Sequence, residues 1–232
     1  YPLNFVFFLT SSVLQALSWF VVFHSLLSFF AFYCLMRVLR LSSPLAFWSA
    51  LIYGISGYNL SVLDNVNYFP CIVWVPLALA AYIQGLKTEN LVYTVWTALC
   101  LAMMVLAGDV FNSFLFMLFT LLMNIMATLG WWQPIDDKEF NAKGFNPWRQ
   151  WLGCGFLVSL LTAVQILPTH ELQQYSVRQK PMAYDEVTLW SFPPIRLLDF
   201  ILPFFFGSKY PAPHFIGVFL YPKFHESWAD SL

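Results

Sequence analysis

The sequence predicts an all-α fold: a polytopic transmembrane bundle of about six helices, followed by an extracytoplasmic C-terminal segment that contains a short interfacial helix. Hydrophobic residues make up 59% of the 232 residues and charged residues only 10%, whereas soluble domains carry roughly 25% charged residues. Several apolar runs approach the roughly 20 residues that a helix needs to cross the hydrocarbon layer of a bilayer. Lipid is therefore the expected solvent for most of the chain.

The predicted membrane domain covers residues 1–167 and begins with an interfacial lead-in. Its spans are expected near residues 12–36, 44–56, 69–85, 91–107, 113–130 and 148–167. The second run is short and ends at Gly54 and Gly57, which permit a turn, so this helix is expected to tilt or dip instead of crossing cleanly. Pro76 lies inside the third run and predicts a kink, because proline has no backbone N–H to donate.

The remaining residues, 168–232, are expected to form the extracytoplasmic segment. Pro168 predicts the end of the sixth span, because proline disrupts a continuing helix. Residues 195–206 are interpreted as an interfacial helix, since 12 residues rise only about 18 Å and cannot cross a bilayer. The chain opens at Tyr1 without the charged region of a signal peptide, which predicts that it is an internal piece of a longer protein.

The distribution of lysine and arginine predicts the orientation, because short cytoplasmic loops retain cations. Alternate loops carry six of these residues: Arg37, Arg40, Lys87, Lys138, Lys143 and Arg149. The intervening loops, 57–68 and 108–112, carry none. The basic loops are therefore predicted to be cytoplasmic, and everything after residue 167 is predicted to face outward.

Charge and cysteine content exclude several classes of partner. The net charge of −1 provides no basic field for phosphate backbones, so no nucleic-acid partner is expected. The four cysteines lie in apolar runs without metal-type spacing, and they are interpreted as packing residues. No metal ligands are predicted, and the cofactor is left open with a divalent cation as one candidate.

Two positions in the first half of the chain invite a specific interpretation. His24 lies in the middle of the first predicted span, where a histidine either forms a hydrogen bond between packed helices or relays protons. Asn59, Leu60 and Ser61 form a glycosylation sequon on the predicted outer side. Such matches also occur by chance.

Polar residues gather at the predicted outer ends of several spans, where they could line a water-filled cleft. The candidates are Asp64, Asn67, Asp109, Gln165, His170, Glu171, Arg178 and Lys180. Among them, His170 offers a titratable base, and Arg178 and Lys180 offer cations that can pair with phosphate oxygens. Two plainer interpretations stay open: ordinary helix caps and loop residues for the set, and anionic lipid headgroup contact for the cations.

Several short motifs occur in a recognisable order along the chain. They are Ala163–Leu172 (AVQILPTHEL), Ser176–Arg178 (SVR) and Leu202–Gly207 (LPFFFG), with supporting matches at Tyr1–Asn4, Ser56–Gly57, Trp74–Leu77 and Ala107–Gly108. In this order and spacing the chain resembles the YfhO family of bacterial polytopic membrane proteins, which is related to the GT-C class of membrane glycosyltransferases. The resemblance extends over nearly the whole chain.

The resemblance implies that the protein lies in the bacterial cytoplasmic (inner) membrane. There it would transfer a sugar from a polyprenyl-phosphate carrier to an extracytoplasmic glycan or polymer acceptor, such as a cell-wall polymer. A carboxylate would act as base on the acceptor hydroxyl, while cations would stabilise the departing lipid phosphate. Asp109, Asp64 or Glu171 would assist the base and Arg178 would hold the phosphate, with Asn67, Gln165, His170 and Lys180 as further substrate-binding candidates. Membrane lipids are the other expected partners.

The chain also departs from the family pattern. Asp64–Asn67 (DNVN) replaces Gly-His-x-Asn, and Gly108–Phe111 (GDVF) replaces Gly-His-Pro-Gln or Gly-Asp-Pro-Gln. By this alignment, the loop that typically carries the catalytic acid of GT-C enzymes precedes Tyr1. Two rival interpretations remain: a non-enzymatic transporter or lipid-handling protein, and a structural or assembly subunit.

Overall fold

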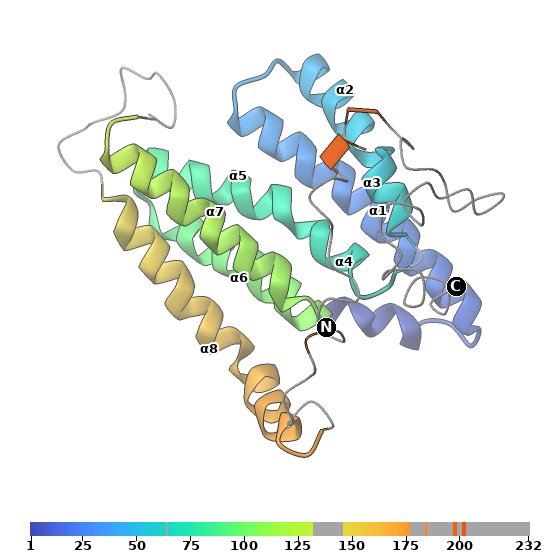
Figure 1. Ribbon diagram of the computed structural model, residues 1–232. Coiled ribbons are helices and arrows are strands. Elements are labelled where there is room, and N and C mark those ends of the chain that lie inside the picture. The colour runs from blue at the N-terminus through green and yellow to red at the C-terminus, as the bar shows by residue number, and fades with distance from the viewer. Residues whose placement is uncertain (64, 132–145, 177–183, 185–196, 199–200, 203–232) are drawn as a thin grey trace. The chain divides into compact units, whose positions relative to one another are not determined.

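The computed structural model describes residues 1–63, 65–131 and 146–176, together with residue 184 and residues 197–198 and 201–202. In these residues every regular element is a helix, which confirms the predicted all-α class (Figure 1). The elements are the 3₁₀ helix η1 (Pro2–Phe8) and the helices α1 (Val13–Val38), α2 (Ser43–Gly54), α3 (Gly57–Ser61), α4 (Phe69–Ile72), α5 (Trp74–Thr88), α6 (Leu91–Ala107), α7 (Val110–Thr128) and α8 (Pro147–Gln173). The chain divides into two compact units, Tyr1–Thr169 and His170–Leu232.

Within the described residues, four helical segments are long and apolar enough to cross a membrane. They are Val13–Val38, Phe69–Thr88, Val110–Thr128 and Pro147–Gln173. The helix α6 has 17 residues and rises about 26 Å, which is at the lower limit for a bilayer crossing. The helix α2 has 12 residues and rises only about 18 Å, as expected for a segment that tilts or dips. The lengths are compatible with a membrane protein, and the count of six crossing helices stays a prediction.

The predicted distortion at Pro76 appears as a break in the third helical segment. Helix α4 ends at Ile72 and α5 begins at Trp74. The break is at Val73, three residues before Pro76, because the proline has no N–H to donate to the carbonyl of Ile72. The segment therefore enters the bundle as two pieces.

The end of α8 differs from the prediction. Pro168 was expected to end the sixth span, but it lies inside α8, which continues to Gln173. The hydroxyl of Thr169 donates to the carbonyl of Gln165 at 2.7 Å, one helical turn back. Thr169 therefore belongs to the helix. The proline removes one backbone hydrogen bond, and the polar side chain beside it helps to satisfy the carbonyls of that turn.

Two short connections join the central helices. The turn between α5 and α6 passes through Glu89, whose φ of 54° lies in the left-handed region. Asn90 then caps α6, because its Oδ1 accepts from the backbone N–H of Val92 at 2.9 Å. The turn between α6 and α7 passes through Gly108, with φ of 114°. Such tight turns place α5, α6 and α7 as antiparallel neighbours (Figure 1).

Helix α5 forms the centre of the first unit and packs against both α1 and α6. Ala78 on α5 and Ala98 on α6 are fully enclosed, and small residues of this kind let helix backbones approach closely. Larger side chains fill the space on either side, notably Tyr82, Leu101 and Phe116 in one cluster. The α5–α6 contact is thus the main core of the unit.

A buried chain of polar side chains joins α5, α7 and α8. The hydroxyl of Tyr82 donates to Oδ1 of Asn124 at 2.7 Å, and Nδ2 of Asn124 lies 3.4 Å from the carbonyl of Pro147 at the start of α8. Nε2 of Gln150 donates to the carbonyl of Tyr82 at 2.9 Å. A buried polar group without its hydrogen-bond partner is costly, so these helices are most stable in the one arrangement that pairs every member. This network therefore specifies how the three helices meet.

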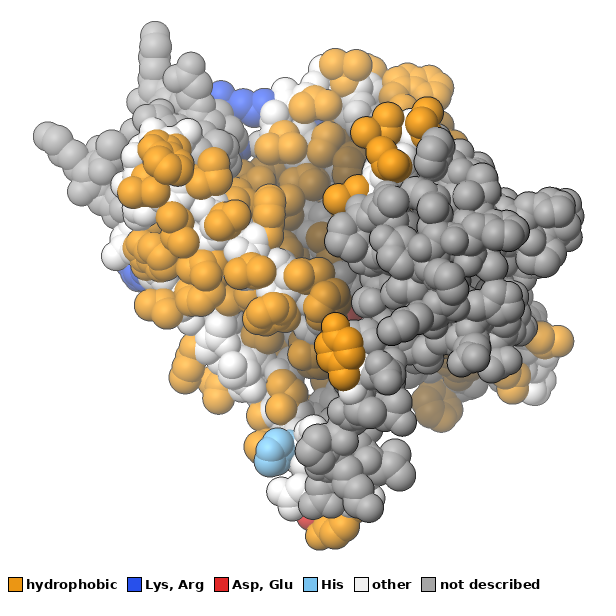
Figure 2. All heavy atoms as spheres, viewed as in Figure 1, with side chains coloured by type: hydrophobic (Ala, Val, Ile, Leu, Met, Phe, Trp, Pro, Cys, Tyr) orange, Lys and Arg blue, Asp and Glu red, His pale blue; other side chains and the backbone are white. Residues whose placement is uncertain are grey.

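Hydrophobic side chains cover the outward face of α7 and α8, with few charged side chains among them (Figure 2). On α8 the residues Leu152, Phe156, Leu160 and Val164 are all exposed, and their four-residue spacing places them on one side of the helix. A soluble monomer rarely exposes a continuous apolar stripe of this length. Lipid contact explains the stripe, because hydrocarbon does not penalise exposed apolar groups.

Two predicted segments are mostly or wholly outside the described residues. The connector over 132–145, predicted to be cytoplasmic, is one of them. The predicted interfacial helix over 195–206 is the other, apart from residues 197–198 and 201–202. The extracytoplasmic position of 168–232 stays a prediction.

Candidate functional site

The C-terminal end of α6 brings several of the predicted site residues together. The last turn of a helix leaves its backbone carbonyls without helical partners. Side chains from two other helices reach the carbonyls of Met104 and Val105 in this turn. Asp109 follows immediately, after Gly108.

Asp109 is held at the start of α7. Its carboxylate accepts from the backbone N–H of Asn112 at 3.1 Å and also from the Asn112 side-chain amide. Only 5% of Asp109 is exposed. The arrangement is that of a helix N-cap, and a negative charge is stabilised there by the helix dipole.

The backbone of Asn67 is linked to the C-terminal end of α6 by the side chain of Cys71. The Cys71 thiol lies 2.8 Å from the backbone carbonyl of Asn67 and 3.3 Å from that of Met104, and it also lies beside Asp109. The side chain of Asn67 is exposed. The connection before α4 is thereby tied to the end of α6.

Gln165 supplies the third contact. Its Nε2 donates to the carbonyl of Val105 at 3.2 Å, so α8 crosses the end of α6 at this point. Asn67, Asp109 and Gln165 thus meet around one helix terminus. Each contact satisfies a helix end, so the geometry gives Asp109 and Gln165 a capping role.

The other predicted site residues are separate from this cluster. His170 and Glu171 lie in the last turn of α8 and are exposed to solvent. Asp64, Arg178 and Lys180 are outside the described residues. Glu171 is therefore a carboxylate that the described structure leaves accessible, unlike Asp109.

His24 sits in a buried hydrogen-bond chain. Its Nδ1 lies 2.7 Å from the carbonyl of Phe20, which can only accept, so Nδ1 carries a proton. Its Nε2 then accepts from the Tyr1 hydroxyl at 2.9 Å, and the Tyr1 oxygen accepts from Nε1 of Trp74, also at 2.9 Å. Burial raises the pKa of the Tyr1 phenol above its usual range, so Tyr1 remains a donor. The chain ends at an indole N–H, which cannot accept a proton, and this favours the packing interpretation of His24.

The glycosylation sequon is enclosed. Asn59 is 2% exposed, and its Nδ2 donates to the carbonyl of Tyr53 at 2.6 Å. Its Oδ1 is buried without a hydrogen-bond partner. The acceptor amide is therefore inaccessible in the folded chain, so the sequon does not mark a modification site of the folded protein.

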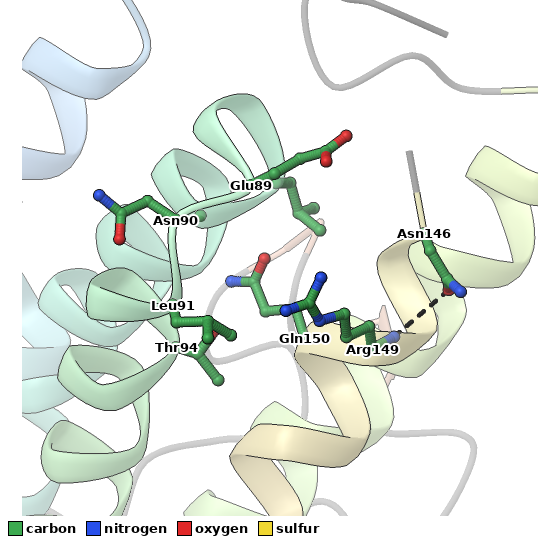
Figure 3. A pocket seen from close by; sticks show the side chains of 9 residues that line it. Glu89, Asn90, Leu91, Thr94, Asn146, Arg149 and Gln150 are labelled. Atoms are coloured by element: carbon green, nitrogen blue, oxygen red, sulfur yellow. Dashed lines mark hydrogen bonds between the residues drawn. The ribbon is translucent and has the colours of Figure 1, made fainter. Parts of the chain in front are cut away.

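A small pocket that sequence reasoning missed lies at the opposite ends of these helices. It measures about 60 Å³ and opens between the α5–α6 turn and the start of α8 (Figure 3). Its polar lining residues are Glu89, Asn90, Thr94, Asn146, Arg149 and Gln150. The sequence did contain one indication of this pocket: Thr94 and Gln150 lie in predicted spans, and polar residues at membrane depth are usually partnered or functional.

No group of three or more histidine, cysteine, aspartate or glutamate side chains that could hold a metal ion occurs among the described residues. No family model, curated protein or solved structure matches the chain. The candidate sites therefore have to be judged from their own geometry and from the residue pattern.

Proposed function

We propose that the chain is part of a multi-pass protein of the bacterial inner membrane that transfers a sugar from a polyprenyl-phosphate carrier to an extracytoplasmic acceptor. The observation that carries the proposal is the run of polar residues at the end of α8, from Gln165 through Glu171 to Arg178. The sequence therefore has a carboxylate, Glu171, in the last turn of a long apolar helix, and two cations, Arg178 and Lys180, after that helix. A lipid-linked phosphate in the headgroup region would meet a polar acceptor at this level.

The carboxylates differ in their suitability as a base. Asp109 already accepts two hydrogen bonds from Asn112 and is nearly enclosed, so an acceptor hydroxyl has little access to it. Glu171 is exposed on the last turn of α8. General-base catalysis needs hydrogen-bond reach to the substrate proton, which makes Glu171 the better candidate. Arg178 would hold the departing phosphate through two parallel hydrogen bonds.

The proposal requires the ends of α8 to lie on opposite sides of the membrane. We expect a cysteine introduced at Glu171 to react with a membrane-impermeant thiol reagent in intact cells, and one at Lys138 to react only after permeabilisation. Background labelling should be low, because three of the chain's four native cysteines are buried. Labelling at Lys138 together with protection at Glu171 would invert the orientation.

The activity test compares Arg178→Lys, Arg178→Ala and Glu171→Gln in the full-length protein. Arg178→Lys keeps the charge but loses the bidentate geometry, and Arg178→Ala loses both, so sugar transfer should fall in that order. Hydrogen bonds to charged groups contribute about 1.5–3 kcal/mol, so Arg178→Ala and Glu171→Gln should each reduce transfer at least about tenfold. Transfer is measured in membranes and normalised to folded protein by gel filtration in detergent.

Arg37→Ala provides the matched control for this test. Arg37 is an exposed arginine in the last turn of α1, on the side predicted to be cytoplasmic, and its guanidinium donates to the carbonyl of Leu41 at 2.8 Å. Its loss should therefore leave transfer unchanged. Transfer at the wild-type rate by Arg178→Ala at equal protein level would return Arg178 to a lipid headgroup contact. A collapse of the folded fraction in both Arg178 variants would make the residue structural.

A second candidate function is a transporter or lipid-handling protein. The break between α4 and α5 favours it, because discontinuous helices often form binding sites in transporters. The two functions differ in their products. Transfer leaves a new covalent glycan on an acceptor, whereas transport moves an unchanged substrate across vesicles that contain the purified protein.

A further inference from the structure

The pocket between the α5–α6 turn and the start of α8 is lined by two buried residues, Gln150 and Thr94, that each have one oxygen without a hydrogen-bond partner. Gln150 is 7% exposed and Thr94 is 5% exposed. The Gln150 amide uses its nitrogen on the carbonyl of Tyr82. Across the described residues, neither Oε1 of Gln150 nor the Thr94 hydroxyl forms a hydrogen bond. Neither oxygen is fully enclosed, since Oδ1 of Asn59 is the one unpartnered side-chain atom that is fully buried among the described residues. Both oxygens are therefore open to a ligand in the pocket.

The rim of the pocket carries one charge of each sign. Arg149 and Glu89 are both exposed, and no ion pair joins these two described residues. Figure 3 shows the Arg149 side chain extending toward Gln150, whereas the Glu89 carboxylate stands apart on the α5–α6 turn. The two charges are thus free to hold the opposite ends of a zwitterion.

The two asparagines of the pocket add hydrogen-bond donors. Oδ1 of Asn90 accepts from Val92 N–H at 2.9 Å, and Oδ1 of Asn146 accepts from Trp148 N–H at 3.1 Å. Both amide oxygens are therefore committed to helix caps, which leaves the NH₂ groups as donors. In Figure 3 the two amides lie on opposite sides of the Arg149 guanidinium, so the guanidinium is the donor in the pocket that can pair with a phosphate.

We propose that this pocket binds a phosphoethanolamine group, the headgroup of a zwitterionic membrane lipid. Arg149 would hold the phosphate, while Glu89 and Oε1 of Gln150 would accept hydrogen bonds from the ammonium. Glu89 disfavours a purely anionic headgroup by charge repulsion, and a trimethylammonium group cannot donate to Gln150. The pocket opens at the start of the apolar helices α6 and α8, at the level where lipid headgroups meet a membrane protein.

The first test measures lipid retention on the purified full-length protein by native mass spectrometry. Phosphatidylethanolamine is compared with phosphatidylglycerol and phosphatidylcholine at equal concentration. We expect phosphatidylethanolamine to be retained preferentially, and Arg149→Gln and Glu89→Gln each to reduce its retention about fivefold, as expected for loss of an exposed charge-assisted contact. Arg37→Gln is the control and should leave retention unchanged. Equal retention of the three lipids, or an equal effect of Arg37→Gln, would overturn the proposal.

A second variant separates ligand chemistry from general damage to the protein. Glu89→Lys leaves two cations on the rim, so its preference should shift from phosphatidylethanolamine to phosphatidylglycerol. An unchanged preference would contradict the assigned role of Glu89. Competition with soluble compounds shows whether the pocket recognises the headgroup or the whole lipid. Soluble phosphoethanolamine should compete with the lipid if the headgroup alone is recognised, whereas glycerol phosphate should not. Competition by both compounds alike would contradict recognition of the ammonium.

The pocket and the proposed transfer site have only the membrane in common. None of these measurements depends on sugar transfer, so failure of one proposal leaves the other standing.

Discussion

Replacing Asn124 by aspartate is expected to lower the free energy of unfolding by about 3 kcal/mol, because it places a carboxylate in the buried polar network at membrane depth. Asn124 is 1% exposed. Its amide nitrogen faces the carbonyl of Pro147 at 3.4 Å, and an aspartate oxygen there would meet a second acceptor. The hydrogen bond from the Tyr82 hydroxyl would remain. The decrease in the free energy of unfolding would therefore come from the buried charge and from the missing N–H donor.

The folded fraction in detergent, measured by gel filtration during titration with a denaturing detergent, gives the change in stability. Asn90→Asp is the matched control, because Asn90 is an exposed N-cap and aspartate caps a helix equally well. It should change stability by less than about 0.5 kcal/mol. Equal stability of Asn124→Asp and the wild type would show that water reaches the network.

Replacing Gly85 by valine is expected to destabilise the protein by about 3 kcal/mol, from overpacking and from the displaced Gln150 amide. A Cβ atom at Gly85 would lie 2.4 Å from Nε2 of Gln150 and 2.8 Å from its Oε1. The glutamine would have to leave its hydrogen bond with Tyr82. The glycine is thus required by the close passage of α8 over α5.

The double variant Gly85→Val with Gln150→Ala tests this explanation, because removing the amide makes room for the added methyl groups. It should be more stable than the sum of the single changes predicts, by about 1 kcal/mol or more. Gly57→Val is the control, since nothing lies within 4 Å of a Cβ built at Gly57. Additive effects in the double variant would place the damage elsewhere in α5.

The helices followed from local features of the sequence. Residues 91–107 were predicted as one helical run, and α6 covers that range because Asn90 caps its start and Gly108 permits the left-handed residue at its end. The prediction failed where a proline had to be interpreted in isolation. Helix α5 begins after a break near Pro76, whereas α8 runs through Pro168, where the Thr169 hydroxyl bonds to the carbonyl of Gln165. The effect of a proline on a helix therefore depends on its surroundings as well as on the proline itself.

The candidate site was predicted only in outline. The positions of Asn67, Asp109 and Gln165 at the predicted outer ends of spans identified them as candidates, and the structure gathers them at the end of α6. That their contacts satisfy helix termini could not be seen from the sequence, since Gln165 and Val105 are 60 residues apart. The function of the polar residues beyond α8 stays a prediction.

The sequence by itself determined that the chain is helical and apolar enough for a membrane, because these properties depend on composition and on contacts within a few residues. Only the tertiary structure decided which polar groups meet. Tyr82 and Asn124 are 42 residues apart, and Gln150 and Tyr82 are 68 residues apart. Such pairs leave no periodicity in the sequence, since each partner is chosen by the packing of whole helices. The network, the glycine contact and the pocket all arise from that packing.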